Sequence, residues 1–394
     1  MTLTQIIGSA LILLFLADVF LTLLYARAGT GLLAPHWNRA VWAMFCAVAR
    51  RFGEPRGAIL SYAGPLIVVS LIGLWALGLT VGVALVIWPE LGGAVRSSSG
   101  ETSTDFSTAL FVAGSSLSIV GGGSDYGPHT AGTRVLFLVN SLIGASVLSL
   151  VVSCLVQVYS AFRERNALAH TVDLLTDGTG DAAMLLARLG PDGNFSDATS
   201  QLSNLARSLA AIKEAHHFYP LLFYFRLRKP LYSIPRVTFI LLDLITLVDT
   251  ALDRDKYGVF VRSSAVRSVR RCALLLLDTL DLNLSGSVGH AAPPLRSGHA
   301  AFTAATETLR HAGIEPRAGG DDYADQRAEW EPLVRRVAAS LCEPFEDVDR
   351  RHSTDETTTA ERSAVGSRPR RSPTLLNETG RIAKEGRRDE RRFH

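Results

Sequence analysis

The sequence lacks the residue patterns that mark most soluble enzymes and nucleic-acid-binding proteins. Its net charge is only +3 and it carries no base-reading motif, so we expect no nucleic-acid partner. It contains no phosphate-binding loop, no metal-ligand motif and no recognisable pairing of a nucleophile with a base. We therefore expect neither an enzyme nor a resident cofactor or metal.

Cysteine is also scarce. The four cysteines lie far apart and show no paired spacing: Cys46, Cys154, Cys272 and Cys342. This distribution predicts neither a metal site nor an extracellular disulfide framework, and it favours reduced thiols on a cytosolic face.

Charged residues make up only 20% of the chain against 47% apolar residues, and they crowd into its C-terminal half. This asymmetry predicts a membrane part followed by a water-soluble part. Residues 3–26 form an apolar run long enough to cross a hydrocarbon core of ~30 Å as a helix. A cleaved signal peptide is the alternative, because Ala26-Arg27-Ala28 resembles a cleavage site, but the start carries no Lys or Arg. Asp18 inside this run either contacts the pore module or reaches water at the helix end.

Residues 27–57 carry five arginines and one acid, with aromatic and apolar residues at helical spacing. This pattern predicts an amphipathic helix in the membrane interface. Residues 58–88 form a second membrane helix, and the loop 90–104 after it has a single basic residue. The positive-inside rule then places 27–57 in the cytoplasm and the N-terminus outside, in a multi-pass protein of the cell (inner or plasma) membrane.

The most informative stretch runs from Asp105 to Phe162. Asp105 can cap a short apolar helix, which stops at three consecutive glycines and is followed by a long apolar helix at 133–160. Non-helical backbone at membrane depth is tolerated only where protein or a water-filled cavity covers it. Backbone carbonyls there can replace the hydration shell of an ion, so we interpret the stretch as a re-entrant pore loop feeding an inner helix. A plain tight turn between two helices is the alternative.

This stretch resembles the pore of the tetrameric potassium-channel family, whose filter reads Thr-Val-Gly-Tyr-Gly-Asp between a pore helix and an inner helix. Three residues match that pattern: Val120, Gly121 and Gly123. The threonine, aromatic and acidic positions are held instead by Ile119, Gly122 and Ser124. The resemblance covers roughly a quarter of the chain, and it implies a bacterial-type channel module with a degenerate filter.

The resemblance also implies particular site residues. The selectivity filter would be formed by Ser118, Ile119, Val120, Gly121, Gly122 and Gly123, and the outer mouth by Ser124, Asp125 and Tyr126. Gly144 falls where the family often keeps a hinge glycine in the inner helix. One chain carries one pore loop, so a ring of filter carbonyls requires several chains, here a homotetramer. The permeant ion would be a monovalent cation, K⁺ or Na⁺.

Beyond Phe162 the pattern is that of soluble amphipathic helices, expected within 185–189, 196–215, 237–252, 259–284, 297–313 and 322–341. The run at 237–252 is very apolar, but its acids and its length of ~17 residues favour a buried soluble helix over a membrane span. The aromatic stretch His216–Phe225 either binds a ligand or the membrane underside, or packs as a bent helix in a core, which we favour. Acids such as Asp243, Asp249, Asp278 and Asp281 are expected on exposed helix faces.

These observations predict an all-α membrane protein with three transmembrane helices and a re-entrant pore helix and loop, followed by an all-helical cytosolic domain and a disordered tail. The expected units are 1–57 (first span and interfacial helix), 58–162 (pore module), 163–345 (cytosolic domain) and 346–394 (charged tail). The expected function is a homotetrameric cation pore in the lipid bilayer, regulated by a cytosolic domain whose ligand or protein partner the sequence does not specify. The alternative is a non-conducting membrane-anchored sensor or scaffold, suggested by Ile119 in place of a hydroxyl residue.

Overall fold

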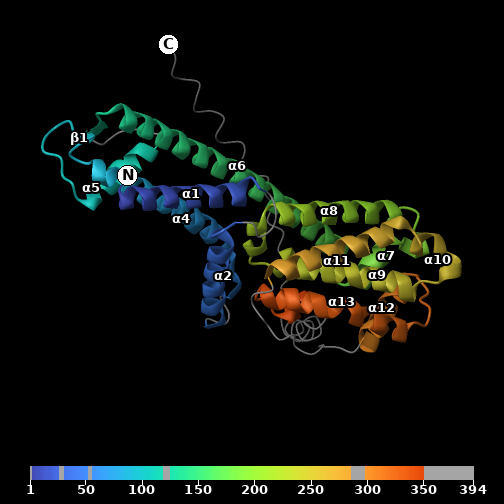
Figure 1. Ribbon diagram of the computed structural model, residues 1–394. Helices are drawn as coiled ribbons and strands as arrows, with labels where there is room; N and C mark the ends of the chain where they lie inside the picture. Colours follow the sequence, from blue (N-terminus) through green and yellow to red (C-terminus); the bar gives the residue numbers. More distant parts are fainter. Residues whose placement is uncertain (1, 26–30, 52–55, 119–124, 285–297, 350–394) are drawn as a thin grey trace, which may run out of the picture. The chain divides into compact units, whose positions relative to one another are not determined.

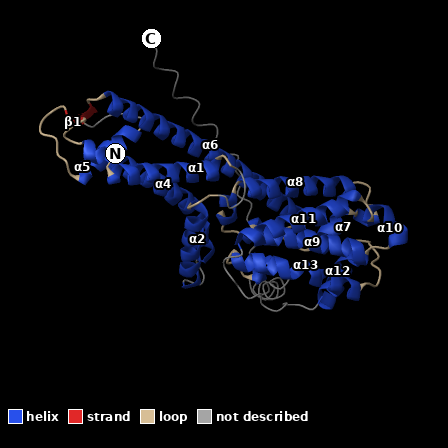
Figure 2. Ribbon diagram, viewed as in Figure 1, coloured by secondary structure: helices blue, strands red, loops and turns tan. Residues whose placement is uncertain are grey.

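The computed structural model describes residues 2–25, 31–51, 56–118, 125–284 and 298–349. Of these residues, 80% are helical, which confirms the prediction of a predominantly α-helical protein (Figure 2). The chain forms one compact unit over residues 1–351, and residues 352–394, which include most of the predicted tail, lie outside the described part.

Three helices are long and apolar enough to cross a membrane, in agreement with the three predicted spans. They are α1 (Leu3–Leu23), α4 (Ala63–Ile87) with the short 3-10 helix η1 (Trp88–Glu90), and α6 (Ala131–Leu175). α1 and α4 pack side by side (Figure 1). Their close approach depends on Gly78 of α4, because a Cβ there would lie 2.1 Å from the ring of Phe15 in α1.

The amphipathic segment after α1 forms α2 (Ala34–Arg51) and the short α3 (Arg56–Ser61). Asp18 of α1 is fully buried and holds the start of α2: its carboxylate accepts hydrogen bonds from the backbone N–H of Leu33 at 2.7 Å and of Ala34 at 3.4 Å. Its second oxygen accepts a bond from the indole N–H of Trp75 in α4 at 2.8 Å. Asp18 is therefore buried and contacts Trp75, which lies within the range 58–162 predicted for the pore module.

The segment between α4 and α6 contains α5 (Phe106–Leu117) and two short strands, β1 (Val95–Ser97) and β2 (Tyr126–Pro128). The strands pair antiparallel, with Val95 opposite Pro128 and Ser97 opposite Tyr126. An all-helical prediction missed them because three residues are too few to show an alternating pattern.

The remaining helices form a C-terminal helical region around α9, which is buried along almost its whole length. In chain order they are α7 (Ala182–Leu189), η2 (Pro191–Gly193), α8 (Ala198–Phe218), η3 (Pro220–Tyr224), η4 (Pro230–Tyr232), α9 (Ile234–Ala251), α10 (Arg254–Val261), α11 (Ser264–Leu284), α12 (Gly298–His311), α13 (Gly320–Ser340) and α14 (Phe345–Val348). α14 occupies the first residues of the predicted tail, and its Val348 is buried.

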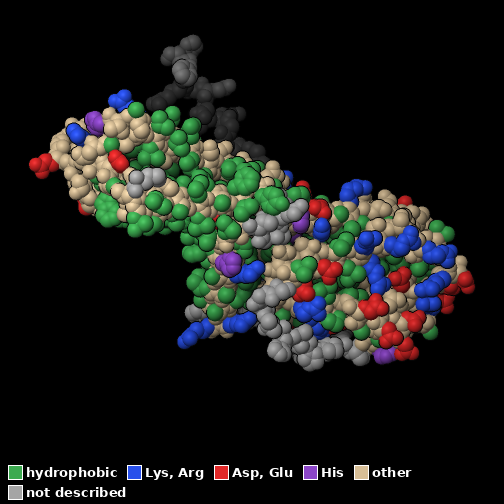
Figure 3. Space-filling model, viewed as in Figure 1, with side chains coloured by type: hydrophobic (Ala, Val, Ile, Leu, Met, Phe, Trp, Pro, Cys, Tyr) green, Lys and Arg blue, Asp and Glu red, His purple; other side chains and the backbone are tan. Residues whose placement is uncertain are grey.

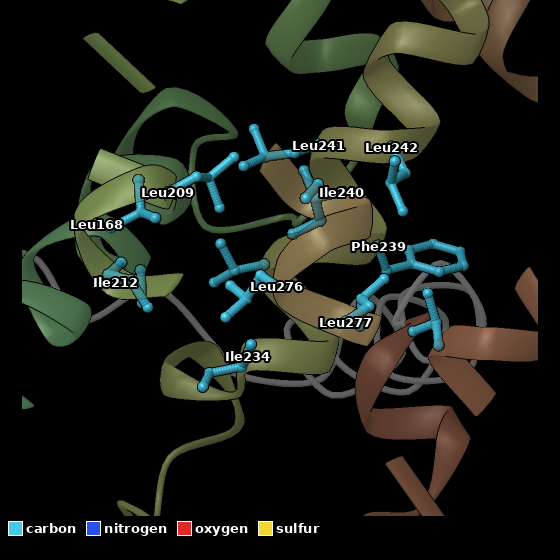
Figure 4. Close-up of a cluster of buried hydrophobic side chains, with 14 of the residues drawn as sticks. Leu168, Leu209, Ile212, Ile234, Phe239, Ile240, Leu241, Leu242, Leu276 and Leu277 are labelled. Atoms are coloured by element: carbon cyan, nitrogen blue, oxygen red, sulfur yellow. The ribbon is translucent and has the colours of Figure 1, made fainter. Parts of the chain in front are cut away.

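Leucines and isoleucines from α6, α8, α9 and α11 meet in the core of this region. Figure 4 shows Leu168 of α6 beside Leu209 and Ile212 of α8, with Ile240 of α9 and Leu276 of α11 facing them. On the visible face in Figure 3, Lys, Arg, Asp and Glu gather over this region, whereas hydrophobic side chains dominate over α1, α4 and α6. The division into a membrane part and a water-soluble part stays a prediction beside this difference in surface.

Two predictions about particular residues are wrong. Cys46 of α2 and Cys342 after α13 form a disulfide across 296 residues of sequence, a pairing that sequence spacing could not indicate because the fold alone brings the two together. Asp243 does not lie on an exposed helix face: it is fully buried in α9. Tyr323 donates its hydroxyl hydrogen to this carboxylate, and Arg327 lies 3.8 Å from it, so a buried cation compensates the buried acid.

Candidate functional site

The structure describes the first residue of the predicted filter, Ser118, and the residues that flank the filter on both sides. Ser118 ends α5, and its N–H donates to the carbonyl of Gly114 at 3.1 Å. Residues 119–124, which hold the rest of the predicted filter and Ser124 of the predicted outer mouth, lie outside the described part of the chain. The site can therefore be built from the elements that hold these ends.

On the far side of the filter, the predicted mouth residue Asp125 is fixed to the loop that precedes α5. The backbone N–H of Ser98 donates to the carbonyl of Asp125 at 2.6 Å, and the hydroxyl of Ser99 donates to its carboxylate at 3.1 Å. Tyr126 follows as the first residue of β2. The short sheet thus ties the exit of the filter segment to the chain in front of α5.

Asp105 takes the position before α5, but its role differs from the expected helix cap. Its carboxylate makes no capping bond to the helix backbone and instead accepts bonds from the hydroxyls of Ser103, Ser107 and Thr108, the last at 2.9 Å. These hydroxyl bonds, that of Ser103 first, hold the pKa of Asp105 well below its usual range. The acid is therefore charged at neutral pH. At the other end of α5, the helix dipole places partial negative charge next to the filter segment.

α5 is held against α6 by one close approach and one buried hydrogen bond. A Cβ at Gly144 of α6 would lie 1.9 Å from the carbonyl oxygen of Leu117, so only glycine fits at this contact. One turn earlier, the side-chain amide of Asn140 donates to the hydroxyl of Ser116 at 3.2 Å, and both residues are buried. α6 continues as one helix through Gly144. The packing role of Gly144 is observed, and its role as a hinge stays a prediction.

α6 presents two different faces to its surroundings. Leu148, Val152 and Val156 form an exposed apolar face. Another face carries exposed polar residues at spacings of three, four and four residues, which places them along one side of a helix: Ser146, Ser149, Ser153 and Gln157. Sequence reasoning missed this polar face, although the spacing itself was the signal that could have revealed it.

The C-terminal end of α6 is anchored to the helical region through buried charges. The guanidinium of Arg165 donates to the carbonyls of Leu222 at 3.1 Å and Phe225 at 2.6 Å. Nearby, the buried carboxylate of Glu343 accepts a bond from the hydroxyl of Ser233 and lies 3.7 Å from Arg226. Burial raises the pKa of Glu343, which Arg226 and the serine bond counteract.

The aromatic stretch 216–225 is part of this junction. α8 ends at Phe218, η3 follows, and residues 221–225 are buried, which agrees with the core alternative. His216 is buried, and burial, with Arg165 nearby, lowers its pKa to about 3, so the ring is neutral at physiological pH.

Among the described residues, no cluster of His, Cys, Asp and Glu could hold a metal ion. Comparisons of the chain with protein families, with curated proteins and with solved structures find no match.

Proposed function

We propose that the chain is the subunit of a homo-oligomeric cation pore, a homotetramer by resemblance, in which the polar face of α6 lines a water-filled passage below the glycine turn. The observation that carries the proposal is the pair of exposed faces on α6. Serine and glutamine side chains are costly toward lipid but suit a water-lined cavity or a second protein surface. A helix in lipid on all its free sides would have no use for such a face.

The burial of the three long helices supports an assembly of several chains. In the most apolar 18-residue stretch of α6, only 11% of the residues are buried, against 39% in the helix Ala63–Glu90. α6 is thus the least covered of these helices in one subunit, although it carries the buried Asn140 and Gly144 contacts to α5. Neighbouring copies of α6 and α5 would cover its apolar face and turn its polar face toward a common axis.

In this arrangement each part has a defined task. The carbonyls at Val120, Gly121 and Gly122 would replace the hydration shell of a monovalent cation, as the resemblance implies. The C-terminal end of α5 would favour positive charge there. Ser146, Ser149 and Ser153 would keep the passage below it hydrated. The contacts of Arg165 and Glu343 would let the C-terminal helical region act on the lower end of α6.

The test uses adjacent residues of α6 that lie on different faces. In a background with Cys154→Ser and Cys272→Ser, Ser149→Cys is compared with Leu148→Cys, and Ser153→Cys with Val152→Cys. A charged thiosulfonate reagent reacts with the thiolate, and a thiol ionises readily only where it faces water. Each unit by which lipid raises the pKa of a cysteine lowers its thiolate fraction about tenfold. We expect modification at 149 and 153 to be about tenfold faster and to block K⁺ or Na⁺ flux into liposomes.

Equal reaction rates within both pairs, or full modification at 149 and 153 without any change in flux, would overturn the proposal. Oligomers that are well folded but conduct neither ion would instead support the membrane-anchored scaffold that Ile119 suggests. A protein that stays monomeric in the bilayer would also refute the pore, because one chain supplies a single filter segment.

A further inference from the structure

A cavity of about 440 Å³ lies between α2 and the chain segments around the end of α13. On the α2 side it is lined by Arg39, Ala43, Ala47 and Arg50, and on the other side by residues that include Cys342. The alanines leave open space between two long cationic side chains on the same face of the helix. A volume of this size is in the usual range for a binding site of a small molecule.

The charge of the cavity is one-sided. No Asp or Glu is among its lining residues, and α2 contains no acid from Ala34 to Arg51. Arg39 and Arg50 are exposed, and no carboxylate of the described residues pairs with either. The helical rise separates their backbone positions by about 16 Å. An anionic group between them would therefore be attracted by both guanidiniums.

The neighbouring surface of α2 indicates where the anion comes from. Met44 is 55% and Val48 is 40% exposed, and the helical spacing places them on the side of α2 roughly opposite to the arginines, with Ala43 and Ala47 in between. α2 connects α1 to α3 and α4, and its first turn is bonded to Asp18 inside α1. In the topology of the proposed function, on which this step rests, α2 lies in the membrane interface, with Met44 and Val48 among acyl chains and the arginines at phosphate depth.

We propose that this cavity binds an anionic glycerophospholipid of the surrounding monolayer. Its phosphate lies between Arg39 and Arg50, and the first carbons of its acyl chains cover Ala43 and Ala47. The floor of the cavity includes Trp42, whose indole N–H donates to the carbonyl of Ser340 at 3.3 Å. Bound lipid therefore bridges the interfacial helix and the end of α13, and it makes the coupling of the helical region to the membrane depend on anionic lipid.

The experiment measures lipid retention by the full chain. The purified protein is equilibrated in mixed micelles of phosphatidylglycerol and phosphatidylcholine, washed, and its retained phospholipids are quantified by mass spectrometry. Arg50→Gln removes a lining charge, and Arg51→Gln removes the neighbouring charge, which does not line the cavity. Ala47→Trp fills the cavity without changing charge.

We expect selective retention of phosphatidylglycerol, reduced about fivefold by Arg50→Gln, further by adding Arg39→Gln, and abolished by Ala47→Trp, with Arg51→Gln unchanged. Equal losses in Arg50→Gln and Arg51→Gln would mean diffuse surface attraction and would overturn the proposal. So would equal retention of both lipids, or unchanged retention in a folded Ala47→Trp protein. Helical content and the mass of the Cys46–Cys342 linked peptides verify folding. Because retention needs no conduction, its failure and the failure of the pore are separate results.

Discussion

Substitution of Gly144 by alanine separates two roles of this residue. A Cβ at this position would lie 1.9 Å from the carbonyl oxygen of Leu117. Non-bonded carbon and oxygen atoms stay about 3.3 Å apart, so α5 and α6 would have to separate by about 1.4 Å at this contact. Overpacking of this kind costs about 1–3 kcal/mol, and alanine in a helix returns about 0.5–1 kcal/mol relative to glycine. Gly144→Ala should therefore lose up to about 2.5 kcal/mol of stability.

Gly132→Ala, in the first turns of the same helix, is the matched control. A Cβ at Gly132 has no neighbouring atom within 4 Å, so this variant should gain about 0.5–1 kcal/mol from helix propensity alone. Unfolding of both variants in the same detergent, followed by tryptophan fluorescence, measures the two changes. Opposite signs are expected. The packing argument is refuted if Gly144→Ala is as stable as Gly132→Ala.

Flux measurements then address the predicted hinge. If Gly144 acts as a hinge without close packing, Gly144→Ala changes ion flux while its stability rises like that of Gly132→Ala. If the contact to Leu117 positions α5 and the filter segment behind it, stability and flux fall together. Reducing the size of Leu117 cannot rescue the variant, because the clash is with its backbone oxygen.

Three further predictions concern the C-terminal helical region. Cys46→Ser removes the disulfide to Cys342 and should lower the free energy of unfolding under oxidising conditions by about 2–5 kcal/mol, with no difference from wild type once both are reduced. The pKa of His216 is about 3 in the folded protein and ~6.5 in the unfolded chain, so between these pH values only the unfolded chain protonates this ring. Acidification through this range therefore lowers the free energy of unfolding by up to ~1.4 kcal/mol per pH unit. His216→Leu should remove this contribution from a pH series of denaturant midpoints. Arg327→Met removes the guanidinium that lies against the buried carboxylates of Asp243 and Asp349, and it should cost about 3–5 kcal/mol. Arg336→Met in an exposed pair should cost less than about 1 kcal/mol, and denaturant unfolding measures both changes.

Long helices were predictable because the periodic spacing of apolar residues within a single segment is enough to indicate a helix. The run that became α9 is an example: its acids and length indicated a buried helix rather than a membrane span, and the structure has a buried helix there. The partner of its acid was not predictable. Asp243 meets Arg327 and Tyr323 from α13, eighty or more residues later, and no local pattern encodes that meeting. The Cys46–Cys342 disulfide was missed for the same reason.

The candidate site divides in a similar way. The two helices that flank the glycine run could be predicted from residue order, since each is contiguous in sequence, whereas the glycine run itself lies outside the described residues. The polar face of α6 was also present in the spacing of Ser146, Ser149 and Ser153, but serine is ordinary in an apolar helix until its exposure is known. The role of Arg165 could not be predicted from the sequence, because its acceptors are the backbone carbonyls of Leu222 and Phe225. Every residue has a backbone carbonyl, so residue type does not indicate which of them accepts the bond.

The contacts along α6 constrain how the helical region could control a pore. The upper contact is at Gly144 against Leu117, and the lower anchor is Arg165, 21 residues later in the same unbroken helix. These points are about 30 Å apart at the helical rise. A small local change at Arg165 therefore cannot reach α5 through side chains alone, and it must shift or tilt α6 as a whole. Since Gly144 leaves no clearance at Leu117, even a small tilt of α6 toward α5 would press on the end of α5, where the predicted filter begins.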